Sequence, residues 1–327
     1  MKIVRALPCP RPAGSRPLAV TIGVFDGVHR GHRAILKATL ARARSLGGEA
    51  AVVTFDRHPL AALAPHAAPR NLMTLESRLA EFKKLGFHHA VVLSFNSRLS
   101  ALTAEQFVRR ILVGRLRAAS VVVGYDFHFG RNGRGDAACL RRLAATLGFT
   151  VTVVPPELDR GEPVSSTRIR RLLALGSVAE ATRLLGRPPV LTGIRVAGRR
   201  LGRRLGFPTV NIRPDGELLP PYGVYFVVAG PDRAGGEGSL GPGVASLGIR
   251  PSIPGRARTP LLEIHFLGQP RECPPGRAMR AELLRFRRPE RRFPDLAALK
   301  KEIKDDVAAA RSFFKEKAHL TQGSRET

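Results

Sequence analysis

Between residues 18 and 175, continuous apolar runs alternate with stretches in which apolar residues recur every three or four positions. The runs predict buried strands, at 18–25, 49–55, 88–95, 120–127 and 149–155. The recurring pattern predicts helices at 31–45 and 104–116. Buried strands separated by helices are typical of a parallel sheet covered on both faces. We therefore predict a doubly wound α/β domain, whose ligands bind at the carboxyl ends of its strands.

The pattern changes after residue 175. Two short helices are predicted on either side of Gly176, followed by a linker at 186–189. Short apolar pieces broken by glycine and proline then predict a small β-barrel, at 189–198, 222–230, 243–249, 261–268 and 280–286. An amphipathic helix at 296–314, capped by Asp295, packs on the barrel, and residues 319–327 form a disordered tail. We place the first domain at residues 1–186 and the second at 187–327.

The length and the charge of the chain agree with two domains but leave its partners open. At 327 residues the chain exceeds the size at which one core keeps growing. It carries 54 Lys and Arg against 26 Asp and Glu, a net charge of +28, and all but nine of the basic residues are Arg. This balance fits either nucleic-acid binding or sites for phosphorylated substrates. The basic residues are spread over the whole length, which favours the second interpretation.

Cysteine usage and hydropathy predict a cytoplasmic protein. The three cysteines, Cys9, Cys139 and Cys273, are far apart and form no Cys-x-x-Cys pair, which argues against a disulfide framework or structural zinc. No stretch approaches the ~20 apolar residues of a membrane span. We expect a soluble protein with no membrane partner.

The first candidate site is the turn between the first predicted strand and the first predicted helix. Its sequence, GVFDGVHRGH, places His29 and His32 on one face of the first helical turn. Glycine-rich backbone and a helix N-terminus bind phosphate, and two imidazoles can stabilise charge that develops on an α-phosphate during attack. We assign the histidines as catalytic and four residues to ATP binding: Gly23, Phe25, Asp26 and Gly31. The alternative is a glycine-rich turn whose histidines are incidental caps.

Two further segments supply residues to this site. Ser165, Ser166 and Thr167 place hydroxyls at a predicted helix start, where they can bind ATP phosphates, and Arg168 can meet the departing pyrophosphate. An ordinary helix cap is the alternative. The loop after the fourth predicted strand (Gly124, Asp126, Phe127 and Phe129) and the last residue of the second predicted strand (Phe55) supply aromatic rings that can stack against a flat ring. The alternative for its aromatic residues is simple core packing.

The predicted barrel contains a second candidate site. Gly202, Gly206 and Pro208 predict a tight loop that binds ATP. Thr209 and Asn211 follow on one side of a strand, and their oxygens suit Mg²⁺ held together with ATP phosphates. Glu263 lies in an apolar strand, where a carboxylate is uncommon without a partner or a function. We assign it as the general base that accepts a hydroxyl proton. An edge-strand glutamate facing water is the alternative.

Together these motifs resemble the bacterial bifunctional riboflavin kinase/FAD synthetase family, over residues 18 to 314. The resemblance rests on the motifs at Gly23–His32, Gly124–Gly130 and Ser165–Arg170, followed by the barrel motif GRRLGFPTVN. It implies that the barrel phosphorylates riboflavin to FMN and that the α/β domain transfers AMP from ATP to FMN. It also implies that the flavin is bound by Phe55, Gly124, Asp126, Phe127 and Phe129. FMN and FAD are then intermediate and product, and Mg²⁺ accompanies ATP in both sites.

The departures from the family pattern lie mostly in the barrel. Val210 replaces an alanine, Ser246 an asparagine, Ser252 a threonine and Pro189 a tyrosine, and a Leu-Tyr-Gly motif is replaced around residues 273–279. Two alternatives therefore stay open. One is a nucleotidyltransferase active only in adenylyl transfer, with the barrel as a flavin-binding module. The other, suggested by the net charge of +28, is a basic nucleic-acid-binding protein.

Overall fold

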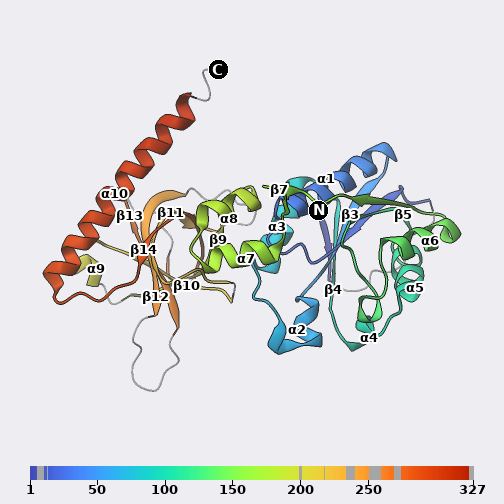
Figure 1. Cartoon of the computed structure of the whole chain (residues 1–327), viewed down its shortest axis with the longest axis horizontal. Helices are drawn as coiled ribbons and strands as arrows, with labels where there is room; N and C mark the ends of the chain where they lie inside the picture. Colours follow the sequence, from blue (N-terminus) through green and yellow to red (C-terminus); the bar gives the residue numbers. More distant parts are fainter. Residues whose placement is uncertain are drawn as a thin grey trace. The chain divides into compact units, whose positions relative to one another are not determined.

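The computed structural model describes residues 1–5, 11–12, 14–198, 201–216, 218–232, 240–249, 259–268 and 274–323. The chain forms two compact units, Met1–Ser166, coloured blue to green, and Thr167–Thr327, coloured green to red (Figure 1). The domain boundary between residues 186 and 187 stays a prediction from sequence. Each unit is described below by itself.

The first unit is the predicted parallel sheet with helices on both faces. Its strands are β1 (Lys2–Val4), β2 (Leu18–Ile22), β3 (Glu49–Phe55), β4 (His89–Leu93), β5 (Ala118–Gly124) and β6 (Thr150–Val154), in the order β1-β4-β3-β2-β5-β6. All five pairings are parallel. Its helical segments are α1 (Arg30–Ser45), α2 (Pro59–Leu63), η1 (Pro65–Ala67), α3 (Leu75–Leu85), α4 (Ser97–Ser100), α5 (Ala104–Phe107), η2 (Val108–Val113), η3 (Arg131–Gly133) and α6 (Ala137–Leu147).

Alternate residues of the central strand enter separate apolar clusters on the two faces of the sheet. In β2, Leu18, Val20 and Ile22 join one cluster, whereas Ala19 joins the other. Both faces are therefore covered, which explains why the strands read as unbroken apolar runs.

Four local features differ from the sequence predictions. The strand predicted to reach residue 25 ends at Ile22, because the glycine-rich turn begins there. The helix predicted at 104–116 is a short α-helix, α5, that continues as the π-helix η2. Strand β1 was missed because three residues are too few for a periodic signal. The hairpin of β7 (Leu158–Asp159) and β8 (Glu162–Pro163) was missed for the same reason.

The second unit is the predicted barrel, preceded by the two predicted helices α7 (Ser166–Ala174) and α8 (Val178–Leu185). The closed barrel has the strand order β10-β13-β12-β11-β14-β9. The strands are β9 (Val190–Val196), β10 (Val210–Pro214), β11 (Gly223–Pro231), β12 (Gly241–Ile249), β13 (Pro260–Phe266) and β14 (Ala278–Pro289), with a short helix α9 (Leu201–Arg204) before β10. Its interior is filled by apolar side chains such as Tyr225, Leu262 and Ile264.

The last helix, α10 (Leu296–Gly323), covers part of the outer face of the barrel. The Asp295 carboxylate accepts a hydrogen bond from Ala298 N at 2.7 Å, as predicted for a cap. Val307 and Ala310 pack with Val224 and Phe226 on the outside of the barrel wall. The prediction of a tail from residue 319 is wrong as far as Gly323, because the helix continues to that residue. Residues 324–327 lie outside the described part.

Candidate active sites

The turn between β2 and α1 has an unusual backbone conformation. Gly27 has a φ of 87°, and two residues with side chains, Phe25 and Val28, also have positive φ values of 52° and 41°. Positive φ is costly for a side chain, and most costly for a β-branched one. Such strain persists only where surrounding contacts hold it and is concentrated at functional sites.

His29 and His32 lie together at the N-terminus of α1. His29 is the N-cap, and its Nδ1 accepts a hydrogen bond from His32 N at 3.3 Å. The two rings are stacked with their centroids 3.6 Å apart, and His29 is buried. Because Nδ1 accepts, a neutral His29 carries its proton on Nε2, from which it can donate to an anion. The first N–H groups of α1 add donors and positive partial charge at the same end.

Several residues assigned to ATP binding also hold this turn in place. The buried Asp26 carboxylate accepts hydrogen bonds from Leu72 N at 2.9 Å, and Ser166 Oγ donates to the Asp26 carbonyl oxygen at 2.9 Å. Phe25 is buried against Phe82 at 5.8 Å between ring centroids. The structure therefore brings the Ser166 hydroxyl to the histidine turn.

Close packing explains why two positions of the turn are glycines. A Cβ at Gly31 would lie 3.2 Å from the Val164 carbonyl oxygen, just before Ser165, and a Cβ at Gly23 would lie 3.0 Å from the Phe25 ring. Thr167 and Arg168 continue α7 as the first residues of the second compact unit.

The residues that we predict to bind the flavin lie at or just after the carboxyl ends of the two strands that flank β2. Phe55 ends β3 and Gly124 ends β5, so both reach the same edge of the sheet as the turn. Phe127 is half-buried and stacks on the buried Phe129, with ring centroids 5.2 Å apart. Phe129 belongs to the core cluster, and Phe127 packs against that cluster. Asp126 is exposed, and its Oδ1 would lie 3.2 Å from a Cβ at Gly124.

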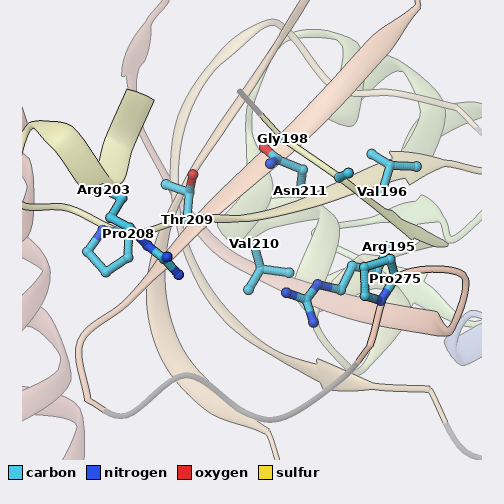
Figure 2. A pocket seen from close by; sticks show the side chains of 10 residues that line it. Arg195, Val196, Gly198, Arg203, Pro208, Thr209, Val210, Asn211 and Pro275 are labelled. Atoms are coloured by element: carbon cyan, nitrogen blue, oxygen red, sulfur yellow. The ribbon is translucent and has the colours of Figure 1, made fainter. Parts of the chain in front are cut away.

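In the second unit, Thr209 and Asn211 line one cavity of about 260 Å³. Figure 2 shows the guanidinium groups of Arg195, from β9, and Arg203, from α9, directed into the same space. Asn211 is buried, and a Cβ at Gly198 would lie 1.9 Å from its Nδ2, so only glycine leaves room for the amide. Two cations beside two neutral oxygens form a polar pocket suited to a phosphate chain.

The predicted loop in front of Thr209 is partly helical. Gly202 lies inside α9, and a Cβ there would lie 2.4 Å from the Phe207 carbonyl oxygen. Gly206 has a φ of 89° in the turn that follows. The Pro208 carbonyl oxygen lies 3.0 Å from Nδ1 of His265 on β13. The chain therefore folds tightly back on itself and presents Thr209 to the cavity.

Glu263 lies in a larger cavity of about 420 Å³ on the outside of the barrel wall. Its neighbours Leu262 and Ile264 enter the barrel core, so Glu263 faces outward, as the sequence alternation predicts. In the strand register Glu263 is paired with Asn211 on one side and with Ser246 on the other. Thr209 lines both cavities, which places the candidate base next to the candidate phosphate site.

One side of the larger cavity is formed by α10 and the end of β14. Leu299, Ile303 and Val307 supply apolar surface, and Phe293 adds an aromatic ring. Arg288 Nη2 and Asp306 Oδ2 form an ion pair at 2.7 Å at this wall. The cavity combines this apolar surface with polar and charged side chains such as Glu263, His265 and Arg288, a lining that suits an organic ligand with polar substituents.

Comparisons with known proteins match each half of the chain to a family. The sequence model of the FAD synthetase family matches residues 12–168, and that of the riboflavin kinase family matches residues 185–314. A bifunctional riboflavin kinase/FMN adenylyltransferase from Pseudomonas fluorescens is 40% identical over 98% of this chain and 100% of its own length. The protein of the same description from Escherichia coli K12 is 36% identical over 96% of this chain and 98% of its own length.

The chain belongs to the bifunctional riboflavin kinase/FMN adenylyltransferase family. A crystal structure described as a macrolide-efflux protein from Streptococcus pneumoniae shares its fold, with a TM-score of 0.80 and 27% identity over 94% of this chain and 99% of that chain. The predicted family and fold class are confirmed.

The departures from the pattern of this riboflavin kinase/FMN adenylyltransferase family fall in different places. The Val210 side chain packs in the barrel core cluster and also lines the smaller cavity beside Thr209 and Asn211 (Figure 2). Ser246 is exposed and lies opposite Glu263, so it shortens the side chain facing the candidate base. Pro189 accepts a hydrogen bond from Leu283 N at the start of β9. Ser252 and Cys273 lie outside the described residues.

Sequence reasoning missed several residues of these sites. Arg195 and Arg203 line the smaller cavity, but an arginine in a chain with so many carries no distinguishing signal. Arg30, inside the histidine motif, pairs with Glu157 at 2.5 Å, and this contact spans 127 positions of sequence. No helix among the described residues is long and apolar enough to cross a membrane.

Proposed function

We propose that this chain makes FAD from riboflavin in two steps, with the barrel phosphorylating riboflavin and the α/β unit adenylylating FMN. The observation that carries the proposal is the pairing of two sites in one chain. Stacked histidines stand at a helix N-terminus in the first unit, and an outward-facing glutamate stands beside a phosphate-type pocket in the second.

In the barrel, Glu263 accepts the proton of the riboflavin 5′-hydroxyl. The hydroxyl oxygen then attacks the γ-phosphorus of ATP, and ADP leaves. The larger cavity takes the flavin ring, and the smaller cavity takes the phosphates beside Arg195 and Arg203. This arrangement follows from the two cavities sharing Thr209.

In the α/β unit, a phosphate oxygen of FMN attacks the α-phosphorus of ATP, and pyrophosphate leaves. The attacking group is already an anion, so the site needs charge stabilisation rather than a strong base. His29 and His32 supply it together with N–H groups of α1. Arg168 is assigned to the pyrophosphate, and Phe55 and Phe127 to the flavin ring.

Thr209 and Asn211 fit a Mg²⁺ ion that arrives with ATP. Both side chains offer neutral oxygens at the same cavity, and Asn211 is buried there. No cluster of three or more His, Cys, Asp or Glu side chains suited to a metal occurs among the described residues. The remaining ligands would therefore be phosphate oxygens and water, as is usual for Mg²⁺, which neutralises charge on the phosphates.

Separate incubations test the two steps. The full chain with Mg²⁺ and ATP is given riboflavin in one tube and FMN in another, and the products are separated by chromatography. We expect FMN and FAD from riboflavin, and FAD from FMN. FAD from FMN without any FMN from riboflavin would favour the alternative in which the barrel only binds flavin. A cytoplasmic location and the absence of nucleic-acid partners are part of the proposal on sequence grounds alone.

A further inference from the structure

Helix α3 faces the histidine turn with a charged side chain that none of the motifs includes. Arg78 is 2% exposed, although it is a cation in the interior of the α/β unit. Its Nη1 donates to the Val24 carbonyl oxygen and to Thr54 Oγ1, and its Nη2 donates to the Phe55 carbonyl oxygen at 3.1 Å. The guanidinium therefore joins the end of β3 to the turn that follows β2.

The contact at Val24 is made where the backbone is strained. Val24 immediately precedes Phe25, the first of the two residues with positive φ. The C=O and N–H of a trans peptide point in opposite directions, so holding the Val24 carbonyl fixes the orientation of the Val24–Phe25 peptide. Thr54 Oγ1 donates to the same carbonyl oxygen at 3.2 Å, which gives this one acceptor two partners.

The same segment holds the second strained residue and the loop between them. Glu81, one turn after Arg78 on α3, pairs with Arg33 at 2.5 Å, and Arg33 Nε donates to the Val28 carbonyl oxygen at 3.3 Å. Leu72 N, just before α3, donates to the Asp26 carboxylate. The turn is thus held at three points by residues 72–81.

Burial of a cation at this position has a cost. Desolvation lowers the pKa of Arg78 from its usual value, and the nearby Asp26 carboxylate opposes that shift. A buried cation is retained when its hydrogen bonds are needed for a particular geometry. An apolar residue at position 78 would fill the core but would leave the Val24 and Phe55 carbonyls without these donors.

We propose that Arg78 is a positioning residue for adenylyl transfer: it holds the strained turn so that His29 and the first N–H groups of α1 meet the α-phosphate of ATP. This inference rests on the proposed function of the first unit. Arg78 does not touch the reacting atoms in this assignment. It acts through the backbone of the turn and through the end of β3.

The test compares Arg78→Lys with Arg11→Lys in the full chain. Lys keeps the charge but loses the planar fork that reaches three acceptors. Arg11 is a matched control, because its guanidinium pairs with Glu49 at 2.8 Å at the opposite, amino-terminal edge of the sheet. Initial rates of FAD formation from FMN are measured at varied ATP, beside FMN formation from riboflavin and the unfolding temperature of each variant.

We expect Arg78→Lys to lower kcat for FAD formation ~10²-fold, the cost of a displacement of about 1 Å at a catalytic group. We expect little change in the KM for ATP or in riboflavin phosphorylation. Arg11→Lys is expected to change only the unfolding temperature. Unchanged kcat in Arg78→Lys, or an equal loss of kcat in Arg11→Lys, would overturn the proposal. Wild-type protein that makes no FAD would overturn the proposed function instead.

A second variant tests the positioning role of Arg78 if Arg78→Lys does not fold. Thr54→Val keeps the shape of the side chain but removes the hydroxyl that bonds both Arg78 and the Val24 carbonyl. We expect it to lower kcat for FAD formation about tenfold, roughly the net effect of the two hydrogen bonds that this hydroxyl makes. A folded Thr54→Val protein with wild-type kcat would count against positioning through this network.

Discussion

At the scale of single residues, His29 serves both the fold and the proposed chemistry. Its Nδ1 caps α1 by accepting from His32 N, and that contact leaves Nε2 as the position of the proton on the neutral ring. His32 stacks on it and also meets the edge of Phe25 at 5.3 Å between centroids. The His29 side chain therefore stabilises the start of α1, whereas the His32 side chain does not take part in this cap. Substitution of His32 is the better test of the proposed chemistry.

We expect His32→Ala to slow FAD formation from FMN by ~10²–10³, the effect of losing one oxyanion-type donor. The physical reason is loss of a positioned donor to the charge that develops at the α-phosphate. FMN formation from riboflavin in the same preparation measures the other site and is expected to persist. Equal loss of both reactions in a folded variant would contradict the assignment of two separate sites.

Glu263 allows a more conservative test in the barrel. Glu263→Gln keeps the shape and removes the basicity, so we expect riboflavin phosphorylation to fall by ~10²–10⁴. Riboflavin binding, followed by flavin fluorescence, is expected to change little, because the amide still accepts a hydrogen bond. FAD formation from supplied FMN serves as the control. A variant that phosphorylates riboflavin as fast as wild type would make Glu263 a structural residue.

At the scale of elements, α10 completes the larger cavity rather than simply covering the barrel. Asp306 on α10 is buried, and Arg288 on β14 bonds it while also meeting Glu302 at 3.0 Å. The aliphatic side chains of the helix then line the cavity beside Glu263. The ion pairs set the position of the helix, and the helix sets one wall of the site.

We expect Asp306→Asn to destabilise the second unit by ~1–3 kcal/mol, less than for a fully buried pair because Arg288 is 16% exposed and keeps Glu302. Riboflavin binding is expected to weaken as the cavity wall loosens. Denaturant unfolding and flavin fluorescence measure the two effects. Asp305→Asn changes the neighbouring, exposed carboxylate and is the matched control. Equal effects of the two substitutions would show that the ion pair does not hold the wall.

At the scale of the whole molecule, the contacts of α7 and α8 indicate where the chain can be cut into fragments that fold. The compact second unit begins at Thr167. Val178 of α8 is 2% exposed and belongs to the barrel core cluster, and a Cβ at Gly176 would lie 3.1 Å from the Phe286 ring. A fragment that starts at Arg187, the predicted boundary, lacks these contacts.

We therefore expect a fragment from Thr167 to Thr327 to phosphorylate riboflavin and to unfold at a higher temperature than one from Arg187 to Thr327. Burial of Val178 and its neighbours gives the longer fragment its advantage, at ~25 cal/mol per Å² of apolar surface. Product chromatography and thermal unfolding compare the two. Equal stability would support the boundary at residue 186. A folded longer fragment that binds riboflavin and ATP but makes no FMN would count against an autonomous kinase.

The sequence by itself determined most of the strand and helix pattern, the α/β and barrel classes, the family and the motif residues. The element pattern and the fold classes follow from hydrophobic periodicity along the chain, and the family follows from the resemblance of the motifs to those of a known family. Only the tertiary structure decided which oxygens Arg78 meets, that Glu263 and Ser246 stand opposite each other, and that α10 walls the larger cavity. Those contacts join residues far apart in sequence. Nothing in the residues next to an arginine indicates which distant groups it will meet once the chain has folded.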